Sequence, residues 1–204
     1  MPLDPTEIER GLRHLRRSDP VMRNVIRRAG PFTLNPSSDR FQALVFSILG
    51  QQISGHAARA IRKRLLAHVA PSRLSAESII RLKMEELRSV GLSKQKAAYI
   101  LDLAEQVASG RLRLNRIGRL SDEEVIAELV QVKGVGVWTA QMFLIFSLGR
   151  LNIFPHTDLG VRTAIQNLYG LEQLPDGETS HRIAERWRPY ASIGAWYCWR
   201  SLEF

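Results

Sequence analysis

Helix boundary signals recur along the whole chain, and they constrain its fold more than any other feature of the sequence. Segments with apolar residues at helical spacing follow residues that favour helix N-caps, and glycines close several of these segments. The candidate caps are Ser38 or Asp39, Ser54, Ser93 and Ser121, and Glu124 completes a capping box with Ser121. Turn residues typical of β-hairpins do not separate the segments. The fold class predicted is therefore all-α.

Several element boundaries follow from the same signals. We expect one helix from Ser75 to Val90, closed by Gly91, and an apolar helix from Trp138 to Leu148. A further helix should run from Leu159 to Tyr169, and Ser180 and Pro189 should open the last two helical stretches.

Charge and cysteine content narrow the function. The 204 residues carry 29 Lys and Arg against 20 Asp and Glu, a net charge of +9, which favours a polyanionic partner such as nucleic acid. One cysteine, Cys198, excludes an internal disulfide and cysteine-built metal sites, so we expect no cofactor. No uninterrupted apolar run reaches ~18 residues and no signal peptide is recognisable. We expect no membrane partner and a cytoplasmic location, which in a prokaryote would be nucleoid-associated.

The segment Val132-Lys133-Gly134-Val135-Gly136 joins a capped helix to an apolar helix. Two glycines one residue apart permit positive φ and let the backbone approach another chain closely. They precede a helix N-terminus, where free N–H groups and the helix dipole attract an anion. An ordinary helix–helix turn would use the same glycines. On a basic chain, however, the segment is suited to gripping one DNA phosphate.

Asp158 lies about twenty residues beyond this hairpin, directly before a predicted helix. An aspartate at such a position is most often an N-cap. A carboxylate can also stabilise positive charge that develops in a reaction while it orients a water molecule. One oxygen could cap the helix while the other serves catalysis.

These motifs, with Thr139-Ala140 after the hairpin, resemble those of the helix–hairpin–helix DNA glycosylase superfamily. The resemblance implies a two-lobed helical fold with a cleft: residues 39–148 form the central lobe, and residues 1–38 and 149–204 form the second. The additional N-terminal β domain of longer relatives is not expected. The resemblance also implies that Asp158 is the catalytic residue, whose carboxylate stabilises the positive charge that develops on the sugar as the N-glycosidic bond breaks. The implied phosphate contacts are Lys133, Gly134, Gly136 and Thr139, with a second set at Ser93 and Lys96. Hairpin carbonyls near Val132 and Gly134 are implied to hold a structural Na⁺ or K⁺.

The resemblance also addresses the substrate. Trp138 occupies the position at which lyase members of the superfamily carry a nucleophilic lysine, so the chain is expected to be monofunctional. The segment from Glu185 to Arg200 is similar to the C-terminal signature of the 3-methyladenine DNA glycosylase II (AlkA-type) family. Trp138 and Trp196 are thereby implied to line the base pocket. Met142 stands where well-known members carry an aromatic residue. Of Trp187, Trp196 and Trp199, we expect two to be core residues.

The segment from Ile48 to Ser54 resembles the element that fills the gap left by a flipped nucleotide, with Gln52 as the inserted side chain. A polar turn between helices would look similar.

The resulting hypothesis is base excision repair: a monomeric, monofunctional glycosylase releases alkylated bases from double-stranded DNA and leaves an abasic site. Two alternatives remain open, a non-catalytic DNA-binding protein and a glycosylase for uracil, mismatched or oxidised bases.

Overall fold

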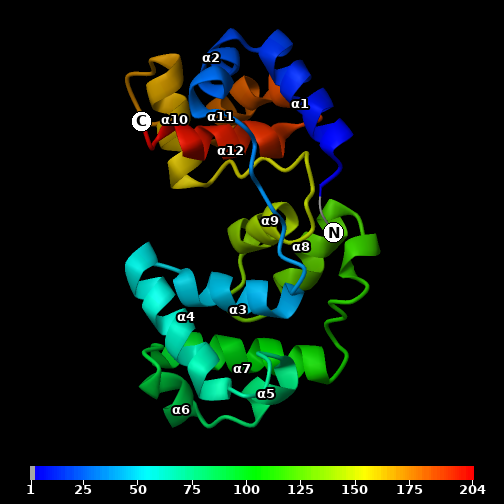
Figure 1. The fold of residues 1–204 in the computed structure, drawn as a ribbon, viewed down its shortest axis with the longest axis vertical. Helices are drawn as coiled ribbons and strands as arrows, with labels where there is room; N and C mark the ends of the chain where they lie inside the picture. The colour runs from blue at the N-terminus through cyan, green and yellow to red at the C-terminus, as the bar shows by residue number, and fades with distance from the viewer. Residues whose placement is uncertain (1–2) are drawn as a thin grey trace. The chain divides into compact units, whose positions relative to one another are not determined.

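The computed structural model describes residues 3–204, and these residues contain helices and no strand (Figure 1). The predicted all-α fold class is therefore confirmed. Two compact units are present, one made of residues 3–36 and 144–204, and the other of residues 37–143. The cleft expected between two lobes stays a prediction. Over the same described residues, no helix has both the length and the apolar character needed to cross a membrane.

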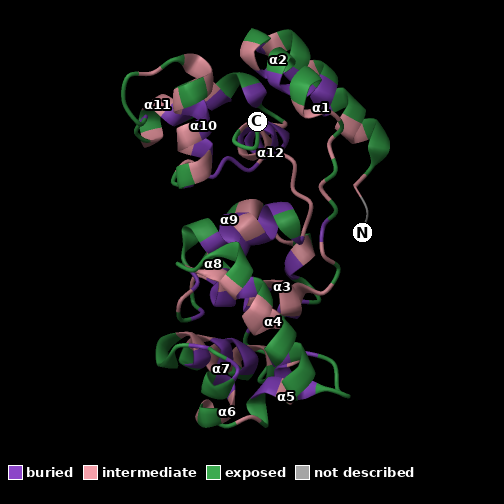
Figure 2. Cartoon of the chain, turned by 60° about the vertical axis from the view of Figure 1, so that its left-hand side comes forward, coloured by how far each residue is buried: buried purple, intermediate pink, exposed green. Residues whose placement is uncertain are grey.

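The first unit draws its helices from both ends of the chain. They are α1 (Pro5–Ser18), α2 (Pro20–Ala29), α10 (Leu159–Tyr169), α11 (Gly177–Ala184), the 3₁₀ turn η2 (Glu185–Trp187) and α12 (Ala191–Ser201). Helix α12 contacts α1, α2, α10 and η2, and every residue from Ala191 to Cys198 is buried (Figure 2). A helix buried on all sides lies at the centre of a core, so α12 organises this unit.

A buried carboxylate, Asp19, ties three elements of this unit together. Its Oδ1 caps α2 by accepting from the backbone N–H groups of Val21 (2.9 Å) and Met22 (3.2 Å). Its Oδ2 accepts from the Tyr169 hydroxyl at the end of α10 (2.5 Å) and from Trp187 Nε1 in η2 (2.9 Å). Asp19 is fully buried, and these four donors compensate the loss of its hydration.

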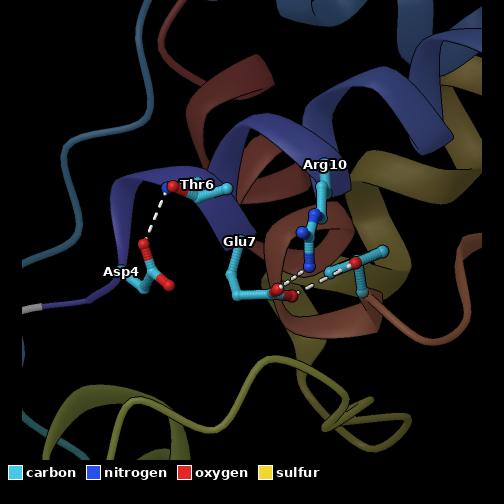
Figure 3. Close-up of polar contacts among 5 residues, drawn as sticks. Asp4, Thr6, Glu7 and Arg10 are labelled. Carbon is cyan, nitrogen blue, oxygen red and sulfur yellow. Dashed lines mark hydrogen bonds and ion pairs between the residues drawn. The ribbon is translucent and has the colours of Figure 1, made fainter.

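The start of α1 shows how polar side chains define a helix end (Figure 3). The carboxylate of Asp4 accepts a hydrogen bond from the backbone N–H of Thr6 at 2.8 Å, as an N-cap does. In the first turn of the helix, Glu7 pairs with Arg10, and its other carboxylate oxygen accepts from the Tyr190 hydroxyl at 3.4 Å. The N-terminal helix is therefore joined to the segment that leads into α12.

The second unit is continuous in sequence. It contains α3 (Arg40–Gly50), α4 (Gly55–Val69), α5 (Ala76–Ile80), α6 (Met84–Ser89), α7 (Lys94–Ala108), η1 (Ile117–Arg119), α8 (Asp122–Leu129) and most of α9 (Val137–Phe146). Helix α7 contacts α3, α5 and α6, and it buries Ile100 and Leu103 completely. Apolar side chains of α3, among them Leu44, Ile48 and Leu49, are equally buried.

Most predicted boundaries are confirmed. Asp39, Ser54, Ser93 and Ser121 each accept a hydrogen bond from the first turn of the following helix. The capping box is closed by the bond from the Ser121 backbone N–H to the Glu124 carboxylate, at 2.7 Å.

Three boundary predictions were wrong. Residues 75–90 form two short helices instead of one, because the Glu86 carboxylate accepts from the Lys83 backbone N–H (2.8 Å) and starts α6 anew. Helix α11 begins at Gly177, where Asp176 accepts from Thr179 N at 2.7 Å, so Ser180 lies inside it. Helix α12 begins at Ala191 rather than at Pro189.

Candidate active site and nucleic-acid interface

Asp158 is the N-cap of α10, as its position in the sequence indicates. Its backbone is extended (φ −67°, ψ 121°), and Oδ1 accepts a hydrogen bond of 2.8 Å from the backbone N–H of Val161. The residue is buried, with 8% of its surface exposed. The helix dipole and the N–H groups of the first turn both favour a negative charge at this place.

A second donor on the same oxygen is the indole of Trp199. Its Nε1 donates a hydrogen bond of 2.8 Å to Oδ1 of Asp158, and it joins α12 to the start of α10. The face of this indole packs beside Phe146, with ring centroids 5.5 Å apart. The carboxylate is thereby held by a backbone donor and by a rigid side-chain donor, so its orientation is fixed before any substrate arrives.

Gly160 leaves the space that this arrangement needs. A Cβ atom there would lie 3.2 Å from Oδ1 of Asp158 and 3.1 Å from Cδ1 of Trp199, which is closer than ordinary packing allows. Neither Trp199 nor Gly160 is among the site residues predicted from the sequence. The cluster of tryptophans near the C-terminus was the available signal, but it does not indicate which indole N–H meets the carboxylate.

The other tryptophans have different surroundings. Trp187 is fully buried and Trp196 is 8% exposed, and both belong to the core of the first unit, so two of the three C-terminal tryptophans are core residues as expected. Trp196 packs edge-on against Phe32, with ring centroids 4.8 Å apart. Trp138 lies on α9 and is 38% exposed, and half-buried Met142 follows one turn later. Trp138 and Trp196 belong to different units, and their shared base pocket stays a prediction.

The two hairpin glycines have distinct roles. Gly134 has φ +79°, and a Cβ atom on it would lie 2.0 Å from the ring of Tyr99 in α7, so both backbone and packing require glycine. Gly136 has no such φ, and no atom lies within 4 Å of the place its Cβ would occupy. It is exposed and directly precedes α9, and its carbonyl accepts a hydrogen bond of 3.0 Å from Ala140 N in the first turn of that helix. Space beside Gly136 is what a backbone contact with a phosphate requires.

Helix α7 supports the hairpin at a second point. The carboxylate of Asp102 accepts from the backbone N–H of Lys133 at 3.0 Å, and it lies 3.7 Å from the Lys133 ammonium. Thr139 is buried, and its hydroxyl lies 3.4 Å from the Gln51 amide nitrogen. The phosphate contacts predicted for Lys133 and Thr139 stay predictions, since their side chains already have partners within the protein.

The remaining predicted DNA contacts lie between α3 and α4 and at the start of α7. Gln52 is exposed, in the turn before Ser54. Ser93 caps α7 through a bond of 3.2 Å from Lys96 N, and the Lys96 ammonium donates to the carbonyls of Leu49 and Gln51. Lys96 therefore contacts the turn that carries Gln52, a connection that the sequence does not indicate.

The hairpin carbonyls are compatible with the predicted monovalent cation. The Val132 oxygen accepts from Val135 N at 3.0 Å, and the Gly134 oxygen accepts from Gln51 Nε2 at 2.9 Å. Each carbonyl oxygen retains a second lone pair that could serve a hard cation. Within residues 3–204, no group of three or more His, Cys, Asp or Glu side chains is placed to hold a metal. The cation stays a prediction.

Comparison of the sequence with known proteins identifies relatives of this chain. The chain is 30% identical over 195 residues to DNA-3-methyladenine glycosylase 1 of Schizosaccharomyces pombe, covering 93% of this chain and 86% of that protein. It is also 35% identical over 127 residues to YfjP of Bacillus subtilis, which is 62% of this chain and only 44% of YfjP.

Solved structures agree in fold. The S. pombe 3-methyladenine DNA glycosylase Mag1, in complex with abasic DNA, superimposes with a TM-score of 0.85 at 28% identity, over 96% of this chain and 97% of that one. A DNA-3-methyladenine glycosidase from Bacillus halodurans gives a TM-score of 0.82 at 34% identity, over 94% and 88%. Residues 45–189 match the family model of the HhH-GPD superfamily of base excision DNA repair proteins. The chain belongs to this superfamily.

Proposed function

We propose that this chain is a monofunctional DNA glycosylase that hydrolyses the N-glycosidic bond of alkylated bases of the 3-methyladenine type. The observation that carries the proposal is the Asp158 carboxylate, fixed by Val161 and Trp199 at the N-terminus of α10. Membership of a base excision repair superfamily supports it, as do full-length relatives whose names specify 3-methyladenine.

Asp158 supplies electrostatic stabilisation. As the bond between C1′ and the base nitrogen lengthens, the base leaves with the bonding electrons and the deoxyribose acquires positive charge. A carboxylate whose orientation is already fixed stabilises that charge without reorganising during the reaction. Water then forms the new bond to C1′ and loses a proton, and the product is an abasic site.

The absence of a lyase step rests on Trp138. A lyase needs an amine that attacks C1′ and forms a Schiff base. Trp138 offers an indole at the corresponding position of α9. The neighbouring Lys133 is paired with Asp102, 3.7 Å away, and lies before the hairpin rather than after it. Water is therefore the nucleophile in this proposal.

The preference for alkylated bases follows from charge. Methylation at N3 or N7 makes a purine cationic, which makes it a better leaving group and attracts it to an electron-rich aromatic face. Trp138 is 38% exposed and can offer such a face. Neutral lesions such as uracil would depend on hydrogen bonds to their edges instead.

The partner in this proposal is double-stranded DNA with a flipped damaged base. The net charge of +9 favours binding to the phosphate backbone, and Gly136 offers backbone contact without reading sequence. Gln52 is exposed at a turn and is assigned to the gap left by the flipped nucleotide. One chain carries each of these groups, so a monomer suffices.

Base release from a panel of defined duplexes tests the proposal. Each duplex would carry one lesion: 3-methyladenine, 7-methylguanine, hypoxanthine, ethenoadenine, uracil or 8-oxoguanine. We expect release of the methylated purines, and no covalent adduct when borohydride is added. Release confined to uracil or 8-oxoguanine would refute the substrate assignment, and a trapped adduct would refute the monofunctional mechanism. Binding without release from any duplex would favour the non-catalytic alternative.

A further inference from the structure

The turn that carries Gln52 has an unusual backbone. Gln52 has φ +53°, and it is the only non-glycine residue with positive φ in the part of the chain that the structure describes. Side chains with a Cβ atom adopt this left-handed conformation at a cost, and it persists only where neighbouring groups impose it. Because Gln52 itself is exposed, the groups that impose the conformation must act on the adjoining backbone.

Lys96 is the first such group. Its ammonium donates hydrogen bonds to the carbonyl of Leu49 at 2.9 Å and to the carbonyl of Gln51 at 2.5 Å, and so closes the C-terminal end of α3. Burial lowers the pKa of this ammonium from its ordinary value. The second carbonyl belongs to the peptide that enters Gln52, so the bond restrains the rotation that sets its φ.

Gln51 is the second group. Its side-chain amide donates to the carbonyl of Gly134 at 2.9 Å, and it lies 3.4 Å from the Thr139 hydroxyl. The turn before α4 is thereby joined to the hairpin before α9. The hairpin also packs on Tyr99, which lies on α7 one turn after Lys96. A single helix, α7, thus supports the turn and the hairpin together.

We propose that Lys96 and Gln51 are positioning residues, which hold Gln52 in its left-handed conformation before DNA binds and set its place relative to the phosphate-binding hairpin. The inference rests on the proposed function, because it takes Gln52 to be the residue that fills the gap. A side chain whose backbone is already ordered loses less conformational entropy when it enters the duplex. Lys96 acts through Gln52 in this arrangement and does not contact a phosphate.

The test uses DNA that cannot be cleaved, so that its result is independent of glycosylase activity. A duplex with a tetrahydrofuran abasic analogue opposite 2-aminopurine reports insertion through the fluorescence of the orphaned base. Gln52→Ala gives the reference fluorescence for a duplex whose gap is not filled by a side chain. Lys96→Met removes the donors at similar side-chain length, Gln51→Leu removes the bond to the hairpin, and Lys83→Met is the matched control for loss of a lysine elsewhere in the unit.

At saturating protein concentration, we expect Lys96→Met and Gln51→Leu to give the same fluorescence signal as Gln52→Ala. Their affinity for the duplex should be about tenfold lower than that of the wild type, because a left-handed conformation at a non-glycine residue has a cost of this order. Lys83→Met should behave as the wild type. The dependence of affinity on salt should be unchanged in Lys96→Met, whereas losing a phosphate contact lowers the slope of log K against log salt by about one.

Three results would overturn the proposal. These are a wild-type fluorescence signal in Lys96→Met and Gln51→Leu, a reduced salt slope in Lys96→Met, and a further loss of affinity when Lys96→Met is added to Gln52→Ala. Far-ultraviolet circular dichroism checks the fold of each variant, and Gln51→Leu decides the matter if Lys96→Met does not fold. Failure of the proposed function is recognised separately, as wild-type protein that inserts Gln52 normally but releases no methylated base.

Discussion

The indole Nε1 of Trp199 donates a 2.8 Å hydrogen bond to the same Asp158 oxygen that caps α10. Hydrogen bonds to charged groups contribute about 1.5–3 kcal/mol. Trp199→Phe keeps an aromatic ring but removes the donor, so we expect single-turnover base release to fall roughly tenfold to a hundredfold. Tyr197→Phe is the control, because it removes a bond of 2.9 Å from the same helix to the Gly30 carbonyl. Equal activity in the two variants would argue against a positioning role for Trp199.

Substitution of Gly136 should weaken DNA binding without lowering the stability of the fold. A methyl group there meets no atom of the protein within 4 Å and requires no unusual φ. It would stand between the hairpin backbone and a phosphate, so Gly136→Ala should weaken binding to an undamaged duplex about tenfold. Its melting temperature should match that of the wild type. Gly134→Ala provides the contrast, since it conflicts with Tyr99 and with φ +79°, and it should lower the melting temperature.

Asp19 should matter to stability. In Asp19→Asn an amide group replaces the oxygen that accepts from Trp187 Nε1 and from Tyr169, and the buried indole N–H loses its acceptor. We expect the free energy of unfolding to fall by about 2 kcal/mol, as measured by urea denaturation. Tyr169→Phe removes one donor and leaves the acceptor for Trp187 in place, so its loss should be smaller. A larger loss in Tyr169→Phe would contradict this account of the buried carboxylate.

Local sequence signals predicted the helices well where a side chain contacts its own helix. Ser121 with Glu124, and Asp158 with Val161, are separated by three residues, so their caps can be inferred from residue type and spacing. The errors arose where a second local bond intervened. Glu86 bonds to Lys83 and breaks the expected long helix, and Asp176 starts α11 before Ser180.

The supporting contacts of the site were not predictable from the sequence, because they join residues far apart in the chain. Trp199 lies 41 residues from Asp158, and Gln51 lies 83 residues from Gly134. Helical periodicity places each of these residues on its helix, but the packing of helices decides which donor meets which acceptor. Lys96 illustrates the point, since nothing in its local sequence indicates that its ammonium bonds to the carbonyls of Leu49 and Gln51.

Single-turnover release of 3-methyladenine by Asp158→Asn tests the central claim most directly. Asparagine retains an oxygen that can cap α10 and accept from Trp199, so the substitution removes the charge while the local geometry persists. We predict that release falls about a thousandfold, as when a fixed electrostatic group is lost from an active site, and that binding to abasic DNA is unchanged. Release at the wild-type rate would contradict the assignment of Asp158 as the residue that stabilises positive charge on the deoxyribose while the base departs.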